Sequence, residues 1–209
     1  VPCGRIGNLE VSRLICGGNL ISGYSHSRDL IYVSSLVKGY FTDDKVIETL
    51  NLCEACGINT AVIRVDNNTL RVIKKYRHRG GKMQWIAQCK ITEKDYTSDA
   101  NAAVDHGAVG AYLHGGVCDE MVAAGKLELL ARGLDHIKTR RVLAGLAAHR
   151  LQVIVAAEQA GLNPDFYMKT LNSGNYWTAG PKLPKPDNWM PEPHRIVEPE
   201  LLDRNQDNS

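Results

Sequence analysis

The chain has few aromatic side chains and almost no net charge. Aromatic residues make up 6% of its 209 residues, and 25 Lys and Arg against 23 Asp and Glu leave a formal charge of +2. A nearly neutral chain lacks the long-range attraction that draws proteins to nucleic acid or to anionic membranes. Scarce aromatic rings also leave little surface on which bases could stack. We therefore expect neither nucleic acid nor a membrane among its partners.

Long apolar runs and paired metal-binding cysteines are missing as well. No apolar run reaches the roughly 18 residues of a membrane span, and no segment has the pattern of a signal peptide. Cys53 and Cys56 have C-x-x-C spacing, but no second pair completes a zinc site. We interpret them as small apolar residues on the buried face of a helix. Reduced thiols favour a cytoplasmic location.

Hydrophobic residues make up 44% of the chain, enough for one core of ordinary domain size. Three times a helix-like stretch is followed by a glycine and an apolar run, at Gly57, Gly107 and Gly161. Glycine just past a helix end supplies the left-handed turn that stops the helix. Repeated βα units of this kind predict an α/β fold with a parallel sheet.

The expected elements are the following. Strands are predicted at residues 12–16, 60–64, 84–89, 109–113, 143–148 and 166–169, and helices at 42–56, 68–76, 98–105, 127–138 and 151–160. Their spacing is typical of a (β/α) barrel of the triosephosphate-isomerase (TIM) type, over residues 1–180. Six of the eight prolines fall in residues 181–199, so residues 181–209 are predicted to be an irregular Pro-rich arm. Six strands leave three alternatives, namely completion by residues outside this chain, an open sheet, or a homo-oligomer that covers the edge.

Five apolar runs are each followed directly by a basic or imidazole side chain. These side chains are Arg64, Lys90, His114, His149 and Lys169. In parallel sheets and barrels the carboxyl ends of the strands meet at one rim, where ligands bind. The pattern therefore predicts an enzyme with a small-molecule substrate that is anionic.

Each of these side chains allows several roles. Lys90 and Lys169 could form a Schiff base or hold a substrate anion. His114 and His149 could act as acid and base, bind a divalent metal or serve in the structure. A metal would also need ligands such as His26, Asp66, Asp119 or Glu120, which have no diagnostic spacing.

The first predicted loop, residues 20–40, is rich in polar groups. Asn19, His26, Arg28 and Asp29 are candidates to bind substrate there, together with Arg64. The pairs Gly17-Gly18 and Gly115-Gly116 allow a close backbone approach or an anion-binding turn. Neither belongs to a G-x-G-x-x-G sequence or a P-loop.

Residues 3–19 resemble the opening of aldo/keto reductases, with a hairpin-like lead-in before V-S-x-L-x-x-G-G. Residues 57–60, Cys89-Lys90, 112–115 and 143–149 are similar, in order, to the family's second to fifth strands, so the resemblance covers roughly residues 3–170. The segments 17–23 and 26–29 also resemble bacterial barrel proteins of unknown function. The resemblance implies a barrel and carbonyl reduction with a nicotinamide cofactor, NADP, with Lys90 and His114 matching two catalytic residues. The family's catalytic aspartate and tyrosine have no counterpart, because residues 60–68 lack both at the expected places.

These observations leave three functions open. The first is a barrel enzyme resembling aldo/keto reductases that acts on a small anionic or polyhydroxylated carbonyl compound. Lys90 and His114 would polarise the carbonyl, while His149, Arg64 and Lys169 bind substrate. The second is a lyase or isomerase that uses an imine on Lys169 or Lys90, or the pair His114 and His149 with protons or a metal. The third is a barrel without catalysis that serves as a binding subunit.

Overall fold

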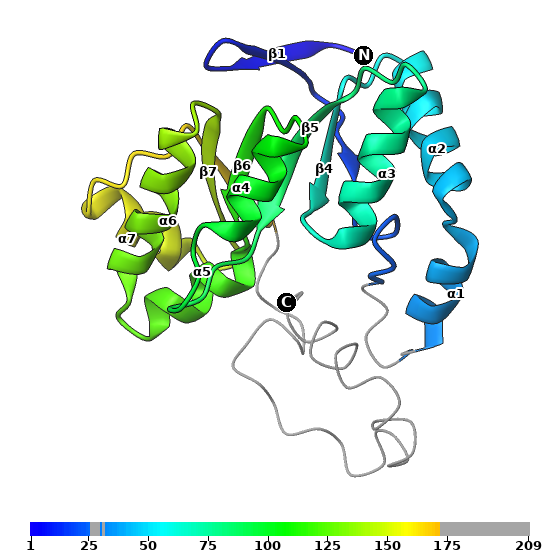
Figure 1. Cartoon of the computed structure of the whole chain (residues 1–209). Coiled ribbons are helices and arrows are strands. Elements are labelled where there is room, and N and C mark those ends of the chain that lie inside the picture. The colour runs from blue at the N-terminus through cyan, green and yellow to red at the C-terminus, as the bar shows by residue number, and fades with distance from the viewer. Residues whose placement is uncertain (26–29, 31, 172–209) are drawn as a thin grey trace.

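The structure, a computed structural model, describes residues 1–25, 30 and 32–171 (Figure 1). The candidate residues His26, Arg28 and Asp29 lie outside the described residues, as does the predicted arm at 181–209. Within the described ranges no helix is both long and apolar enough to cross a bilayer.

A six-stranded parallel sheet forms the centre of the molecule. Its strands are β3 (Cys16–Gly17), β4 (Thr60–Arg64), β5 (Gln84–Cys89), β6 (Gly110–Leu113), β7 (Leu143–Ala148) and β8 (Phe166–Lys169). They lie side by side in chain order, and every neighbouring pair is parallel. The sheet curls into a half-barrel, so the α/β class and a partial barrel are confirmed. All five strands predicted after the first are present within one residue of their expected bounds.

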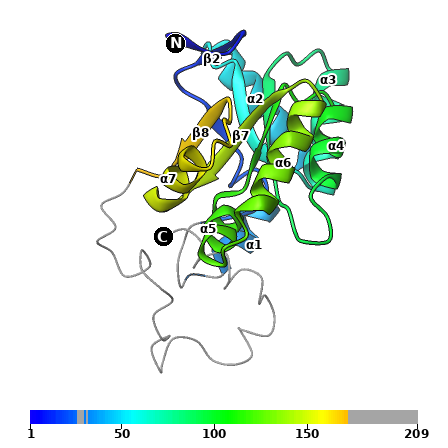
Figure 2. The same ribbon diagram turned by 90° about the vertical axis from the view of Figure 1, so that its left-hand side faces the viewer.

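Helices cover the outer face of this sheet. They are α1 (Tyr32–Tyr40), α2 (Asp43–Ala55), α3 (Asn67–His78), α4 (Ser98–Asp105), α5 (Gly115–Ala123), α6 (Leu127–Thr139) and α7 (Leu151–Gln159). Figure 2 shows α3, α4 and α6 stacked along one face of the sheet. The main core lies between them and the strands, and includes Leu50, Trp85 and Leu134, each at most 1% exposed. Gly57, Gly107 and Gly161 all have positive φ just past helix ends, as the repeated pattern predicted.

The first strand was predicted wrongly. Residues 12–16 are not one strand, because β1 (Cys3–Ile6) and β2 (Leu9–Ser12) form a separate antiparallel hairpin. Asn59 ties this hairpin to the start of β4, since its Oδ1 accepts from Ser12 N (2.8 Å) and its Nδ2 donates to Glu10 O (3.1 Å). After this hairpin, only the two residues Cys16–Gly17 of the first segment pair with β4 in the large sheet.

Two helices were not predicted. Helix α1 occupies part of the expected loop at residues 20–40, and α5 begins directly after β6. The C-x-x-C prediction is wrong in part, because Cys53 is half-buried in α2 whereas Cys56, at the end of that helix, is exposed. The six cysteines are all free thiols, and among the described residues no cluster of three or more His, Cys, Asp or Glu could hold a metal ion.

Candidate functional site

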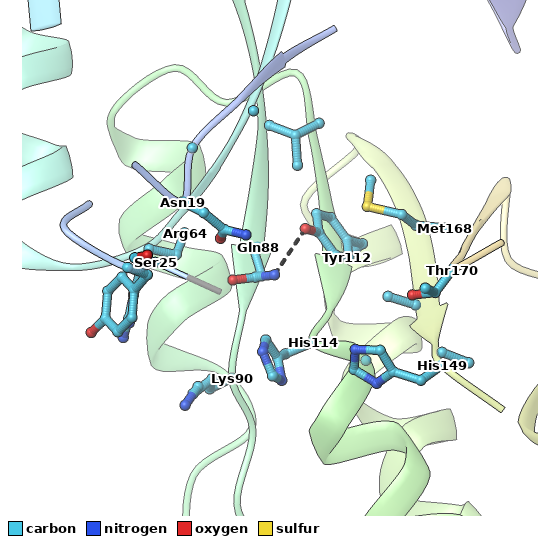
Figure 3. A pocket seen from close by; sticks show the side chains of 17 residues that line it. Asn19, Ser25, Arg64, Gln88, Lys90, Tyr112, His114, His149, Met168 and Thr170 are labelled. Atoms are coloured by element: carbon cyan, nitrogen blue, oxygen red, sulfur yellow. Dashed lines mark hydrogen bonds between the residues drawn. The ribbon is translucent and has the colours of Figure 1, made fainter. Parts of the chain in front are cut away.

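The inner, concave face of the half-barrel holds a cavity of about 290 Å³ at the carboxyl ends of the strands. Successive side chains of a strand point to opposite faces, so each strand contributes every second residue. The contributing side chains are Val62, Arg64, Gln88, Lys90, Tyr112, His114, Ala147, His149, Met168 and Thr170. Four of them, Val62, Tyr112, Ala147 and Met168, also pack with Ile86 and Phe166 into a small apolar floor. Figure 3 shows the labelled members of this set converging on one space.

Two cationic side chains lie at one side of the cavity. The Arg64 guanidinium lies 4.3 Å from the Tyr24 ring centre, and its Nε is 3.2 Å from Asp66 Oδ2. Asp66 is itself fixed, because its Oδ1 accepts from Thr69 N (2.7 Å) as the N-cap of α3. Lys90 follows β5, and its backbone N–H donates to Asp99 Oδ2 (2.9 Å). Arg64 and Lys90 therefore line one side of the cavity, with the carboxylates of Asp66 and Asp99 beside them.

His114 caps the first turn of α5. Its Nδ1 accepts from Val117 N (3.4 Å), so the ring proton must be on Nε2. Burial, together with the neighbouring groups Lys90, His149 and Arg64, lowers the pKa of His114 to about 4. The imidazole is therefore neutral at pH 7. A neutral ring with a proton on Nε2 is a hydrogen-bond donor for a carbonyl oxygen.

His149 is also hydrogen-bonded through Nδ1, but its partner there is an acceptor, the carboxylate of Asp119, and not a donor. Its Nδ1 lies 2.7 Å from Asp119 Oδ2, and the two side chains are only 17% and 13% exposed. Asp119 also accepts from the backbone N of His149 and of Arg150, at 3.2 Å each. Burial raises the pKa of Asp119, but these hydrogen bonds outweigh it and leave the pKa below its usual value. An ionised Asp119 holds the ring proton of His149 on Nδ1, so Nε2 can act as a base.

Gln88 and Tyr112 lie one layer deeper and were not predicted. Gln88 Nε2 donates to the Tyr112 hydroxyl oxygen (3.1 Å), and Tyr112 is 2% exposed. Burial raises the pKa of Tyr112 beyond its usual value, so the phenol is neutral and retains its proton. Both residues stand two positions before a predicted site residue, Lys90 or His114. The two-residue period of a strand could have identified them.

Lys169 is not in this cavity. Its Nζ donates to His149 O (2.5 Å) and Thr170 O (2.6 Å), and the side chain is exposed. The strand register explains this, because Met168 pairs with Ala147 and faces inward, which turns the next residue outward. Of the five strand-end side chains, the structure thus brings together Arg64, Lys90, His114 and His149.

The first loop contributes Asn19 and Ser25 to the cavity wall. Gly18 brings this loop against β4, since a Cβ at Gly18 would lie 2.6 Å from Ile63 Cα and 2.7 Å from Val62 O. The expectation that the Gly17-Gly18 pair allows a close backbone approach therefore holds at Gly18.

Two of the residues considered as metal ligands have other partners. Asp66 pairs with Arg64, and Asp119 pairs with His149.

Comparison of the sequence with protein-family models and with curated proteins finds no match. The likeness to aldo/keto reductases consequently stays a prediction. The cavity itself combines two cationic side chains on one side, two neutral donors in His114 and Tyr112, and a carboxylate-held imidazole in His149. This set can bind an anion, polarise a carbonyl group and remove a proton beside it.

Proposed function

We propose that this cavity catalyses proton transfer at the carbon next to the carbonyl group of a small anionic compound, as an isomerase does. The observation that carries the proposal is the pairing of His149 with Asp119 at 2.7 Å, in the same cavity as a neutral His114. One imidazole is arranged to accept a proton and the other to donate a hydrogen bond. In architecture we assign the chain to the TIM-type barrels, on the strand order and the position of the cavity.

The reaction follows from the position of each group. Arg64 and Lys90 bind the anionic group of the substrate. His114 Nε2–H and the Tyr112 hydroxyl donate to the carbonyl oxygen. His149 Nε2 removes the proton from the neighbouring carbon, and the electron pair of that C–H bond forms the C=C bond of an enol or enolate. The negative charge that develops on oxygen is stabilised by the two donors. In a substrate whose neighbouring carbon carries a hydroxyl group, His149 then returns the proton to the former carbonyl carbon, while the hydroxyl proton moves to the former carbonyl oxygen, so that the carbonyl and hydroxyl groups exchange places.

Deuterium incorporation tests this proposal without knowledge of the product. A panel of small keto acids, hydroxy acids and sugar phosphates is incubated with the protein in D₂O, and loss of the proton signal next to the carbonyl is followed by NMR. We expect exchange for at least one anionic member. The variant His149→Asn should lose roughly 100-fold or more of the rate, whereas His78→Asn, on the exposed part of α3, should not change it. No exchange above the buffer rate, or full exchange in His149→Asn, would contradict the proposal.

Carbonyl reduction is a second candidate, because Tyr112 brings a phenol proton donor into the cavity that holds Lys90 and His114. These are three of the four residue types that the resemblance implies, although the tyrosine comes from a different strand. NADPH would supply the hydride. The test is loss of NADPH absorbance with the same panel of carbonyl compounds. Trp85 is a poor fluorescence reporter, because it is 1% exposed in the core behind the sheet and donates to Ile63 O (2.9 Å).

A further inference from the structure

The two sides of the cavity differ in chemistry. Figure 3 shows Arg64 and Lys90 on one side and Met168 and Thr170 on the other, with His114 between them. From this arrangement we infer that the substrate is a short-chain keto or hydroxy acid with a plain alkyl end, and not a polyhydroxylated compound. The inference rests on the proposed function, because it assumes that the carbonyl oxygen sits at His114 and Tyr112.

The side that carries Arg64 and Lys90 fixes the orientation of the substrate. Arg64 and Lys90 come from the adjacent strands β4 and β5, and the donors to the carbonyl come from β6. A carboxylate at Arg64 and Lys90 with its carbonyl at His114 directs the rest of the molecule toward β7 and β8. In an α-keto acid the carboxylate and the carbonyl are directly bonded, which suits groups on neighbouring strands.

The wall at β7 and β8 is apolar. It consists of Ala147 and Met168, and within the described part of the chain its only polar side chains are His149 and Thr170, both at the rim. A substrate hydroxyl in this place would lose its water without gaining a hydrogen bond, which is costly. An alkyl group would instead gain free energy from leaving water.

The floor limits the length of that alkyl group. The Phe166 ring lies over Gly145, where a Cβ would come within 2.3 Å of the ring, and it packs edge-on to Tyr112 with ring centres 6.3 Å apart. The apolar wall therefore ends a short way below Met168. The floor and the cavity volume of about 290 Å³ therefore favour a short alkyl group.

Binding of two ligands of the same shape tests the inference. The dissociation constant is measured by NMR titration for α-ketovalerate and for its isostere in which a hydroxyl replaces the terminal methyl group. We expect the alkyl compound to bind roughly 10- to 100-fold more tightly. In Met168→Gln, which puts an amide into the wall, the preference should fall below threefold or reverse, while Met168→Leu should keep it. Arg64→Gln should weaken both ligands alike.

The outcomes separate this inference from the proposed function. Equal affinities in the unsubstituted protein, tighter binding of the hydroxyl compound, or no binding of either would overturn the alkyl-acid assignment. Selective binding of α-ketovalerate without deuterium exchange of any bound keto acid would uphold the assignment and contradict the proton-transfer chemistry. Deuterium exchange in sugar phosphates alone would uphold that chemistry and overturn the assignment.

Discussion

Two histidines in the cavity are bound at the same ring atom by opposite partners. The Nδ1 of His114 accepts from the backbone N–H of Val117, whereas the Nδ1 of His149 faces the carboxylate of Asp119. The two Nε2 atoms are consequently a donor and an acceptor. This difference depends on α5, which supplies both Val117 and Asp119.

The carboxylate of Asp119 should be essential to the rate and not to binding. Asp119→Asn keeps the size of the side chain but removes the charge that holds the proton on Nδ1 of His149. We expect the deuterium exchange rate to fall by roughly 100- to 10,000-fold. The dissociation constant of the substrate should change less than about threefold. Glu120→Gln, the exposed neighbour on the same helix, is the matched control and should leave both values unchanged.

His114 should make the protein sensitive to acid. Its pKa is about 4 in the folded protein against 6.5 for an unperturbed histidine, so the unfolded chain takes up the proton first as the pH falls. Its contribution to stability is complete above pH 6.5 and is lost toward pH 4. Between pH 7 and pH 5 this should cost about 2 kcal/mol of unfolding free energy.

Urea unfolding at pH 7 and pH 5 measures this effect. His114→Asn retains a side-chain acceptor for the first turn of α5 and cannot titrate, so it should lose about 2 kcal/mol less than the unsubstituted protein over this interval. The variant His78→Asn should lose as much as the unsubstituted protein. An equal loss in His114→Asn and in the unsubstituted protein would show that His114 is not held neutral by its surroundings.

The sequence predicted most of the residues at the rim of the cavity, but not the residues deeper inside it. The residue that directly follows each apolar run was taken as a candidate, because strand ends meet at one rim. This rule correctly selected Arg64, Lys90, His114 and His149. The same rule fails in β8, because Met168 faces the cavity there and the selected residue, Lys169, faces outward. Gln88 and Tyr112 were missed because only the residue after each strand was considered. The partner of His149 was missed because the helix that carries Asp119 was not predicted.

At the scale of elements, the first loop lies tightly against the backbone of β4 beside the cavity. Gly18→Ala would place a Cβ within 3.0 Å of the β4 backbone, so either the loop or the strand must move. We expect a loss of about 3 kcal/mol of unfolding free energy. Gly17→Ala is the control, since nothing lies within 4 Å of its added Cβ. Urea unfolding of both variants would contradict this packing if the losses were equal.

The sequence predicted the regular βα units well because each carries its own pattern of apolar residues and a glycine stop. The helix at residues 98–105 has the bounds that were predicted, and its N-cap residue Thr97 makes no side-chain cap hydrogen bond. Asp95 instead accepts from the backbone N of Thr97 and Ser98, at 3.0 Å each. Helix α5 escaped prediction because it begins with two glycines and is capped by a histidine. Helix α1 leaves Tyr32, Leu36 and Tyr40 exposed, so it lacks the buried stripe that marks the other helices.

At the scale of the whole molecule, stability should be highest in the middle of the sheet. Strands β5 and β6 are paired on both sides and their side chains are almost completely buried, whereas β1 and β2 pair only with each other in the described structure. Amide hydrogen exchange should therefore be slowest in β5 and β6 and much faster in the hairpin β1–β2. Equal protection of the hairpin and of β5 would contradict this order.

The central claim is that the cavity presents one imidazole as a donor and another as an acceptor. Nitrogen NMR of the histidine side chains at pH 7 measures it directly, without any substrate, with His114→Asn and His149→Asn used to assign the signals. The account predicts a proton on Nε2 and none on Nδ1 of His114, and a proton on Nδ1 and none on Nε2 of His149. A proton on Nδ1 of His114, a bare Nδ1 on His149 or a proton on Nε2 of His149 would contradict it.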